Sequence, residues 1–96
     1  MDGHEFEWDA AKAESNLVKH GVSFEIAQWV FNDMFASELC DFDSAPGEIR
    51  YVITGQVNDI LLRVVYIERG DRIRIISARK ATMNEQKEYY RSQTAE

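Results

Sequence analysis

The sequence is poor in cysteine, proline and glycine, and it has no long apolar run. Its one cysteine, Cys40, excludes an intramolecular disulfide and the CxxC pattern of structural zinc sites. One proline and five glycines among 96 residues, with 45% hydrophobic residues, exclude a disordered chain. No segment approaches the roughly 20 apolar residues that span a bilayer, and the first residues lack a signal peptide's apolar core. We therefore expect one soluble, cytoplasmic domain over residues 1–96, since so short a chain can build only one core.

Basic residues are scarce overall but unevenly distributed. The net charge of -6 argues against nucleic acid as a partner, because polyanions are bound mostly through Lys and Arg. Residues 1–48 hold 11 acidic side chains against 2 lysines, whereas residues 49–96 hold 9 basic side chains against 6 acidic ones. Six of those nine fall in one short stretch: Arg63, Arg69, Arg72, Arg74, Arg79 and Lys80. A local basic surface on an acidic protein is expected.

Two helices are predicted near the start of the chain. Asp9 can cap a helix from Ala10 to His20, and Gly21 then stands where a positive φ is needed. Ser23 can cap a second helix, from Phe24 to about Asp33. A third helix, from Met83 to about Ser92, is indicated by Thr82-Met83-Asn84-Glu85, which matches a capping box.

The remaining elements predict a small antiparallel sheet. Alternating side chains favour a short strand at Glu5 to Trp8, and the composition of Glu38 to Pro46 favours a loop. Three runs rich in Ile, Val and Tyr, separated by the turn dipeptides Asn58-Asp59 and Gly70-Asp71, favour an antiparallel meander: Glu48 to Val57, Ile60 to Glu68 and Arg72 to Arg79. The fold class is therefore α+β, with a three-stranded meander, a short N-terminal strand, two N-terminal helices and one C-terminal helix.

One face of this meander is predicted to carry arginines. Two-residue turns would fix the register and place the following side chains together: Arg50, Val52, Thr54, Arg63, Val65, Ile67, Arg74, Ile76 and Ala78. We call this surface the arginine face. The opposite face is apolar enough to receive the helices.

Several side chains could bind or cleave a phosphodiester. Arginine donates two hydrogen bonds to phosphate. For any single arginine a solvated outer face of the sheet is the better explanation, but three arginines on one predicted face favour a binding surface. Arg79 and Lys80 end a strand just before a helix, whose N-terminus attracts anions. His20 could transfer protons, or it could simply end a helix whose dipole favours a cation. Tyr89 and Tyr90 could stack on bases.

No metal or other cofactor is expected. Asp41-x-Asp43 offers two carboxylates without a third partner, and such a pair is usually a solvated turn.

Distinctive motifs stand along most of the chain. They are Phe6-Glu7-Trp8-Asp9, Asn16, Lys19-His20-Gly21-Val22-Ser23-Phe24-Glu25, Ala27, Phe31, Gly47-Glu48-x-Arg50 and Ile75-Ile76-Ser77-Ala78-Arg79-Lys80-Ala81-Thr82, with Glu85 and Tyr89. In this order and at this spacing they resemble the BrnT family of toxins. The resemblance implies a fold similar to RelE-like ribonuclease toxins and an activity, RNA cleavage that arrests growth. It also implies an antitoxin of the BrnA type, with a ribbon-helix-helix part that binds operator DNA.

The resemblance and the face argument together give the expected site. Lys19, His20, Arg50, Arg79 and Lys80 stand at motif positions, whereas Arg63 and Arg74 enter only through the arginine face. We expect His20, Arg50 and Arg79 to be catalytic, and the other four to bind RNA.

The leading hypothesis is a metal-independent endoribonuclease that an antitoxin neutralises. The alternative is a non-catalytic interaction module, or co-repressor, that uses the arginine face for protein acids. A plain DNA-binding domain is disfavoured, because the acidic first half offers no basic recognition helix.

Overall fold

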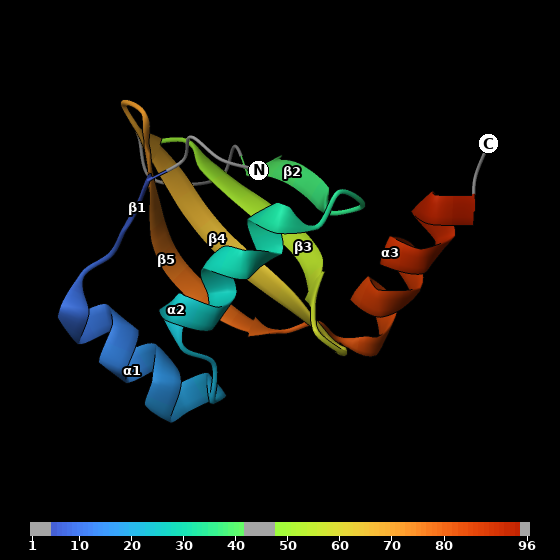
Figure 1. The fold of residues 1–96 in the computed structure, drawn as a ribbon, viewed down its shortest axis with the longest axis horizontal. Coiled ribbons are helices and arrows are strands. Elements are labelled where there is room, and N and C mark those ends of the chain that lie inside the picture. The colour runs from blue at the N-terminus through green and yellow to red at the C-terminus, as the bar shows by residue number, and fades with distance from the viewer. Residues whose placement is uncertain (1–4, 42–47, 95–96) are drawn as a thin grey trace.

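The computed structural model describes residues 5–41 and 48–94, and shows helices packed on a five-stranded mixed sheet (Figure 1). Asp43 and Pro46 of the expected loop lie outside these residues. The strand order is β1-β5-β4-β3-β2. The elements are β1 (Glu5–Glu7), α1 (Ala10–His20), α2 (Phe24–Ala27), the 3-10 helix η1 (Gln28–Asn32), β2 (Ser37–Asp41), β3 (Arg50–Val57), β4 (Ile60–Arg69), β5 (Arg72–Lys80) and α3 (Met83–Thr94). The α+β class is confirmed.

The caps predicted for the first two helices are present. The Asp9 carboxylate accepts from the Lys12 amide, and Gly21 ends α1 at a φ of 71°. Ser23 caps α2 in the same way. The expectation of one helix continuing to Asp33 is wrong, because α2 tightens into η1 after four residues.

The 3-10 helix η1 packs closely against β3. Val30 of η1 is fully buried, and a Cβ added to Gly55 of β3 would lie 2.9 Å from its Cγ1. Only glycine lets η1 approach the sheet so closely.

The three-stranded meander is confirmed, with Asn58 and Gly70 adopting positive φ in its two turns. Two expectations about the rest of the sheet are wrong. β1 runs parallel to β5, so the sheet is mixed. Residues 37–41 form the edge strand β2 instead of a loop. An edge strand buries few side chains, so its polar composition resembled that of a loop.

A bulge changes the predicted arginine face. Val65 pairs with Ser77 and Tyr66 pairs with Ile75, so Ile76 is an extra residue in β5. Beyond the bulge the faces are exchanged relative to the prediction: Ala78 enters the core, and Ser77 and Arg79 join the arginine face. Placing Ala78 on that face was therefore wrong, whereas Arg63, Arg74 and the β3 residues keep their predicted register.

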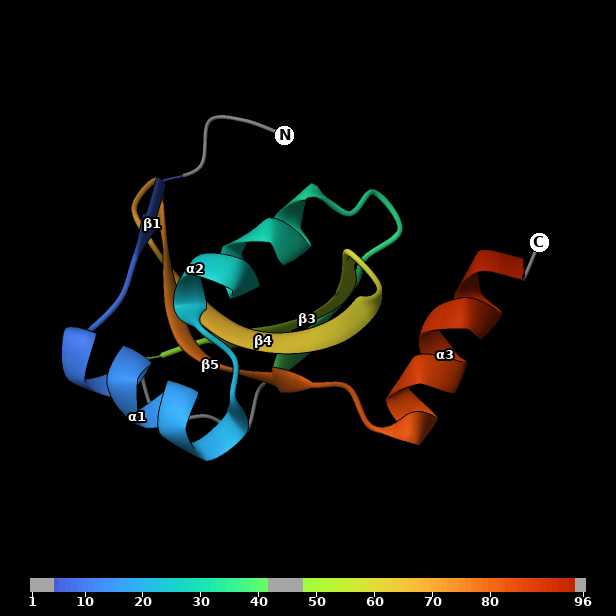
Figure 2. The same ribbon diagram turned by 60° about the horizontal axis from the view of Figure 1, so that its bottom comes forward.

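The main core lies between the opposite face of the sheet and the three helical segments α1, α2 and η1. Its fully buried members include Phe24, Val30, Val64 and Ile75. In both views α3 stands apart from these helices (Figure 2). It packs instead through Tyr89 onto Leu61 and Ala81, which form a second, smaller cluster.

Candidate functional site

Arg63 and Arg79 lie side by side at the centre of the candidate site. They are register partners on β4 and β5, so their side chains leave the same face of the sheet. Both guanidinium groups reach one carboxylate, that of Glu85 on α3. Arg79 donates to its two oxygens at 2.9 Å each, and Nε of Arg63 lies 3.3 Å from Oε2. We call these three residues the Glu85 cluster.

The capping box fixes the position of Glu85. Its Oε1 accepts from the Thr82 amide at 2.8 Å, and the Glu85 amide donates to the Thr82 hydroxyl. The hydrogen bonds from Arg79 and Thr82, with the nearby charge of Arg63, outweigh burial and lower the pKa of Glu85 to about 2. Glu85 is therefore a carboxylate at any physiological pH. The sequence indicated its capping role but not its contact with the arginines.

Arg74 belongs to a second group, centred on Glu7 of β1. Arg74 donates to Glu7 at 3.1 Å, while Arg72 and Arg69 lie at 3.5 Å and 3.9 Å from the same carboxylate. Mainly through the hydrogen bond from Arg74, these contacts lower the pKa of Glu7. We call these four residues the Glu7 cluster. It joins the parallel edge strand β1 to β5.

Arg50 occupies the first position of β3, and its Nε lies 3.2 Å from Oε1 of Glu48. The structure therefore does not bring Arg50 into the Glu85 cluster. Each of the four expected arginines faces a carboxylate of the chain itself. This pairing reduces the positive potential that the sequence predicts for the arginine face.

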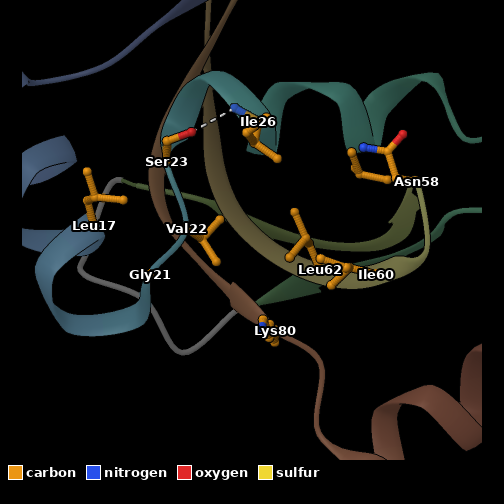
Figure 3. Close-up of a pocket in the computed structure, with 10 residues that line it drawn as sticks. Leu17, Gly21, Val22, Ser23, Ile26, Asn58, Ile60, Leu62 and Lys80 are labelled. Atoms are coloured by element: carbon orange, nitrogen blue, oxygen red, sulfur yellow. Dashed lines mark hydrogen bonds between the residues drawn. The ribbon is translucent and has the colours of Figure 1, made fainter.

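Lys80 points away from Arg79, because neighbours in a strand alternate faces. It lines a mostly apolar pocket of about 320 Å³ beside α1 and α2 (Figure 3). The pocket is lined by Leu17, Gly21, Val22, Ser23, Ile26, Val57, Asn58, Ile60, Leu62 and Lys80. A phosphate at Arg79 would not meet Lys80 as the sequence suggested.

Lys19 and His20 form the last turn of α1, on the helical side of the sheet. A buried neighbour on that helix, Asn16, connects this corner to β5. Its side chain donates to the carbonyls of Val22 and Ala78 and accepts from the Ala78 amide. The segment that carries Lys19 and His20 is thus fixed next to the residue that precedes Arg79.

Tyr89 is buried, with only 2% of its surface exposed, so it is not available to stack on a base. Its hydroxyl donates to Asp33, at the end of η1. Burial, and then the contact with Asp33, raise the pKa of Tyr89. Burial alone would raise the pKa of Asp33, but hydrogen bonds from Tyr89 and from two amides lower it. This contact, which the sequence did not indicate, fastens α3. Tyr90 is half exposed.

Two further observations concern the described part of the chain. Residues 5–41 and 48–94 contain no group of three His, Cys, Asp or Glu side chains placed to hold a metal ion, and Asp43 lies outside them. No helix in these ranges is long and apolar enough to cross a membrane.

Comparison with known proteins identifies a family. A family model described as "Ribonuclease toxin, BrnT, of type II toxin-antitoxin system" matches residues 8–85. This span contains α1, the whole β2–β5 sheet and the capping box with Glu85. No curated protein matches the sequence.

Proposed function

Because the chain belongs to the BrnT family of ribonuclease toxins from type II toxin-antitoxin systems, we propose that it is a metal-independent endoribonuclease whose active site is built around Arg79 and Arg63. The substrate is RNA. The 2′-hydroxyl loses its proton and attacks the adjacent phosphate, the P–O5′ bond breaks, and the products are a 2′,3′-cyclic phosphate and a 5′-hydroxyl that has taken up a proton. An antitoxin covers the site.

The observation that carries this proposal is the pairing of Arg63 with Arg79 on one face of the sheet, before the N-terminus of α3. Two guanidinium groups already converge there on a pair of carboxylate oxygens. A phosphate presents oxygens to arginine with the same planar, bidentate geometry. The negative charge that grows on these oxygens during attack by the 2′-hydroxyl would be stabilised by groups that are already in place.

The other expected residues have supporting roles in this proposal. His20 lies on the helical side of the sheet, away from the arginine pair, so in this proposal it orients RNA that passes around the end of β5. Arg50 contacts a phosphate at the start of β3. Arg74 binds the RNA backbone on the arginine face, and Lys19 and Lys80 bind it on the helical side of the sheet. For these contacts to form, Arg50 must leave its ion pair with Glu48, and Arg74 must leave its ion pair with Glu7.

The proposed partner is an antitoxin of the BrnA type, whose ribbon-helix-helix part binds operator DNA. The toxin reaches the operator only through it. Both act in the cytoplasm. We expect the antitoxin to cover Arg79, because neutralisation requires the arginine pair to become inaccessible to RNA.

The decisive experiment is Arg79→Ala, with Arg72→Ala as the control from the Glu7 cluster. Removing one charge-stabilising donor typically costs about 3 kcal/mol, or roughly a hundredfold in cleavage rate. Arg79→Ala should permit growth under full induction while staying folded and still binding the antitoxin. Arg72, whose side chain is 55% exposed, should be replaceable without loss of toxicity.

The measurements are growth after induction without antitoxin, RNA integrity, and single-turnover cleavage by purified protein. Full toxicity of folded Arg79→Ala would place the active site elsewhere. If the wild type binds antitoxin but cleaves no RNA, the chain is a non-catalytic interaction module.

A further inference from the structure

We propose that Glu85 occupies the phosphate position between Arg63 and Arg79, so that an RNA phosphate must displace it before the arginine pair can bind substrate. This inference rests on the proposed function. To a site otherwise defined by its arginines, it adds Glu85 as a residue that controls the affinity for substrate.

The first support is the arrangement of the two Glu85 oxygens. Both accept hydrogen bonds from the Arg79 fork at 2.9 Å, and Oε2 also lies 3.3 Å from Nε of Arg63. A phosphate bound by the same fork would place two oxygens where these now lie. Glu85 and a substrate phosphate therefore exclude each other.

The second support is that capping α3 does not require the ion pairs. The capping box uses Oε1 of Glu85 and the amide of Thr82. Glutamine serves this position as well as glutamate does. The negative charge and its contacts with two arginines are thus additional to the cap.

The third support is that the contact lies within reach of solvent. The side chains of Arg63 and Arg79 are 22% and 39% exposed, and that of Glu85 is 18% exposed. A phosphate can therefore approach Arg79 from outside while Glu85 turns away. Because α3 is also held by Tyr89 at Asp33, the carboxylate can leave without the whole helix detaching.

The test compares Glu85→Gln with Glu88→Gln. Both changes remove one negative charge from α3, and Glu88 is exposed on the same helix. The probe is a short RNA with methylated 2′-hydroxyls, which binds but cannot be cleaved. We expect Glu85→Gln to bind it about fivefold more tightly, since Arg79 no longer exchanges one charged partner for another. Its salt slope, the slope of the logarithm of the binding constant against the logarithm of the salt concentration, should steepen by about 0.7. This is the value for one more neutralised phosphate on a single strand. Glu88→Gln should show little of either change.

Thr82→Ala separates the charge from the cap. It removes the hydroxyl that accepts from the Glu85 amide but leaves the carboxylate in place. Its RNA affinity should stay at the wild-type value while its thermal stability falls. A gain in affinity equal to that of Glu85→Gln would show that loosening α3 is responsible, and would overturn the proposal.

Two further outcomes would also overturn it. Equal affinity gains in Glu85→Gln and Glu88→Gln would mean that only net charge matters. Slower cleavage by Glu85→Gln at unchanged affinity would make Glu85 a catalytic group. Failure of the proposed function is recognised separately, because the wild type would then cleave no RNA, or Arg79→Ala would cleave it at the wild-type rate.

Discussion

The two arginine clusters contain the same kinds of residue but hold them differently. In the Glu85 cluster, Arg79 grips the carboxylate with two hydrogen bonds of 2.9 Å, and Glu85 sits in a helix cap. In the Glu7 cluster, three arginines spread around one carboxylate at 3.1 to 3.9 Å, and two of them are more than half exposed. The Glu7 cluster closes the edge of the sheet between β1 and β5. The Glu85 cluster lies where β5 ends and α3 begins.

This difference shows why counting arginines on a face does not locate a site. Exposed ion pairs contribute little energy and rearrange easily, so the Glu7 cluster holds the edge strand only weakly and can contact a backbone phosphate loosely. A bidentate pair set by a cap is preorganised, which is what stabilisation of a transition state needs. The following predictions test this distinction, from the largest expected effect to the smallest.

Asn16→Ala should have the largest effect, on folding stability. The substitution leaves the Ala78 amide, the Ala78 carbonyl and the Val22 carbonyl without their partner in a buried position. We expect a loss of about 3 kcal/mol in the free energy of unfolding, measured by urea denaturation. Ser15→Ala, at an exposed position of the same helix, is the control.

Asn16 also distinguishes the clusters, because it contacts β5 beyond the bulge, next to Arg79 and away from Arg74. In hydrogen exchange under native conditions, amides around Ala78 should lose more protection than those paired with β1. Equal loss at both ends of β5 would contradict this division.

Arg63→Ala and Arg74→Ala compare the clusters directly. Arg63→Ala should slow single-turnover cleavage by roughly thirtyfold, about 2 kcal/mol, because Arg63 contacts Oε2 of Glu85, one of the two oxygens that Arg79 binds. Arg74→Ala should mainly weaken RNA binding and reduce the salt slope by the amount for about one phosphate. It should change the cleavage rate of bound RNA little. The reverse pattern would place the chemistry at the Glu7 cluster.

Much of the fold was predictable from local signals, and the site only in part. Caps and turns depend on a few adjacent residues, so Asp9, Gly21 and the Thr82 capping box were read correctly. The bulge at Ile76 and the parallel pairing of β1 depend on tertiary packing, which no local pattern records. The prediction that Arg63 lies on the arginine face is confirmed.

The partners of these side chains could not be predicted in the same way. Glu85 was visible as a cap, but its contact with Arg79 depends on where β5 ends relative to α3. Tyr89 looked available for stacking, since nothing in the sequence linked it to Asp33, which is 56 residues away. The roles of His20 and Lys19 stay predictions.

The Glu85 cluster should contribute to folding stability in a pH-dependent way. The folded-state pKa of Glu85 is about 2, against 4.5 for an unperturbed glutamate. Its contribution to stability is therefore complete above pH 4.5 and is lost as pH falls toward 2. After allowance for solvent screening, this contribution is on the order of 1 to 2 kcal/mol. Thermal unfolding between pH 5 and pH 2 should show a shallower loss of stability in Glu85→Gln than in the wild type. Parallel curves would mean that the pair contributes nothing.

Glu7→Gln should have the smallest effect, and it tests whether the Glu7 cluster is structural. The amide retains one hydrogen-bond acceptor for Arg74 but loses the charge that attracts Arg69 and Arg72. Because β1 has only three residues and lies at the edge of the sheet, this loss should loosen β1 locally without unfolding the domain. Faster hydrogen exchange at the Phe6 amide, with unchanged protection in β4 and unchanged cleavage rate, is the expected result. RNA affinity should rise slightly as Arg74 becomes freer, by less than in Glu85→Gln, because surface pairs already exchange partners easily. If Glu7→Gln instead raises affinity and steepens the salt slope as much as Glu85→Gln does, the two clusters are equivalent phosphate sites, and preorganisation by the α3 cap does not distinguish them.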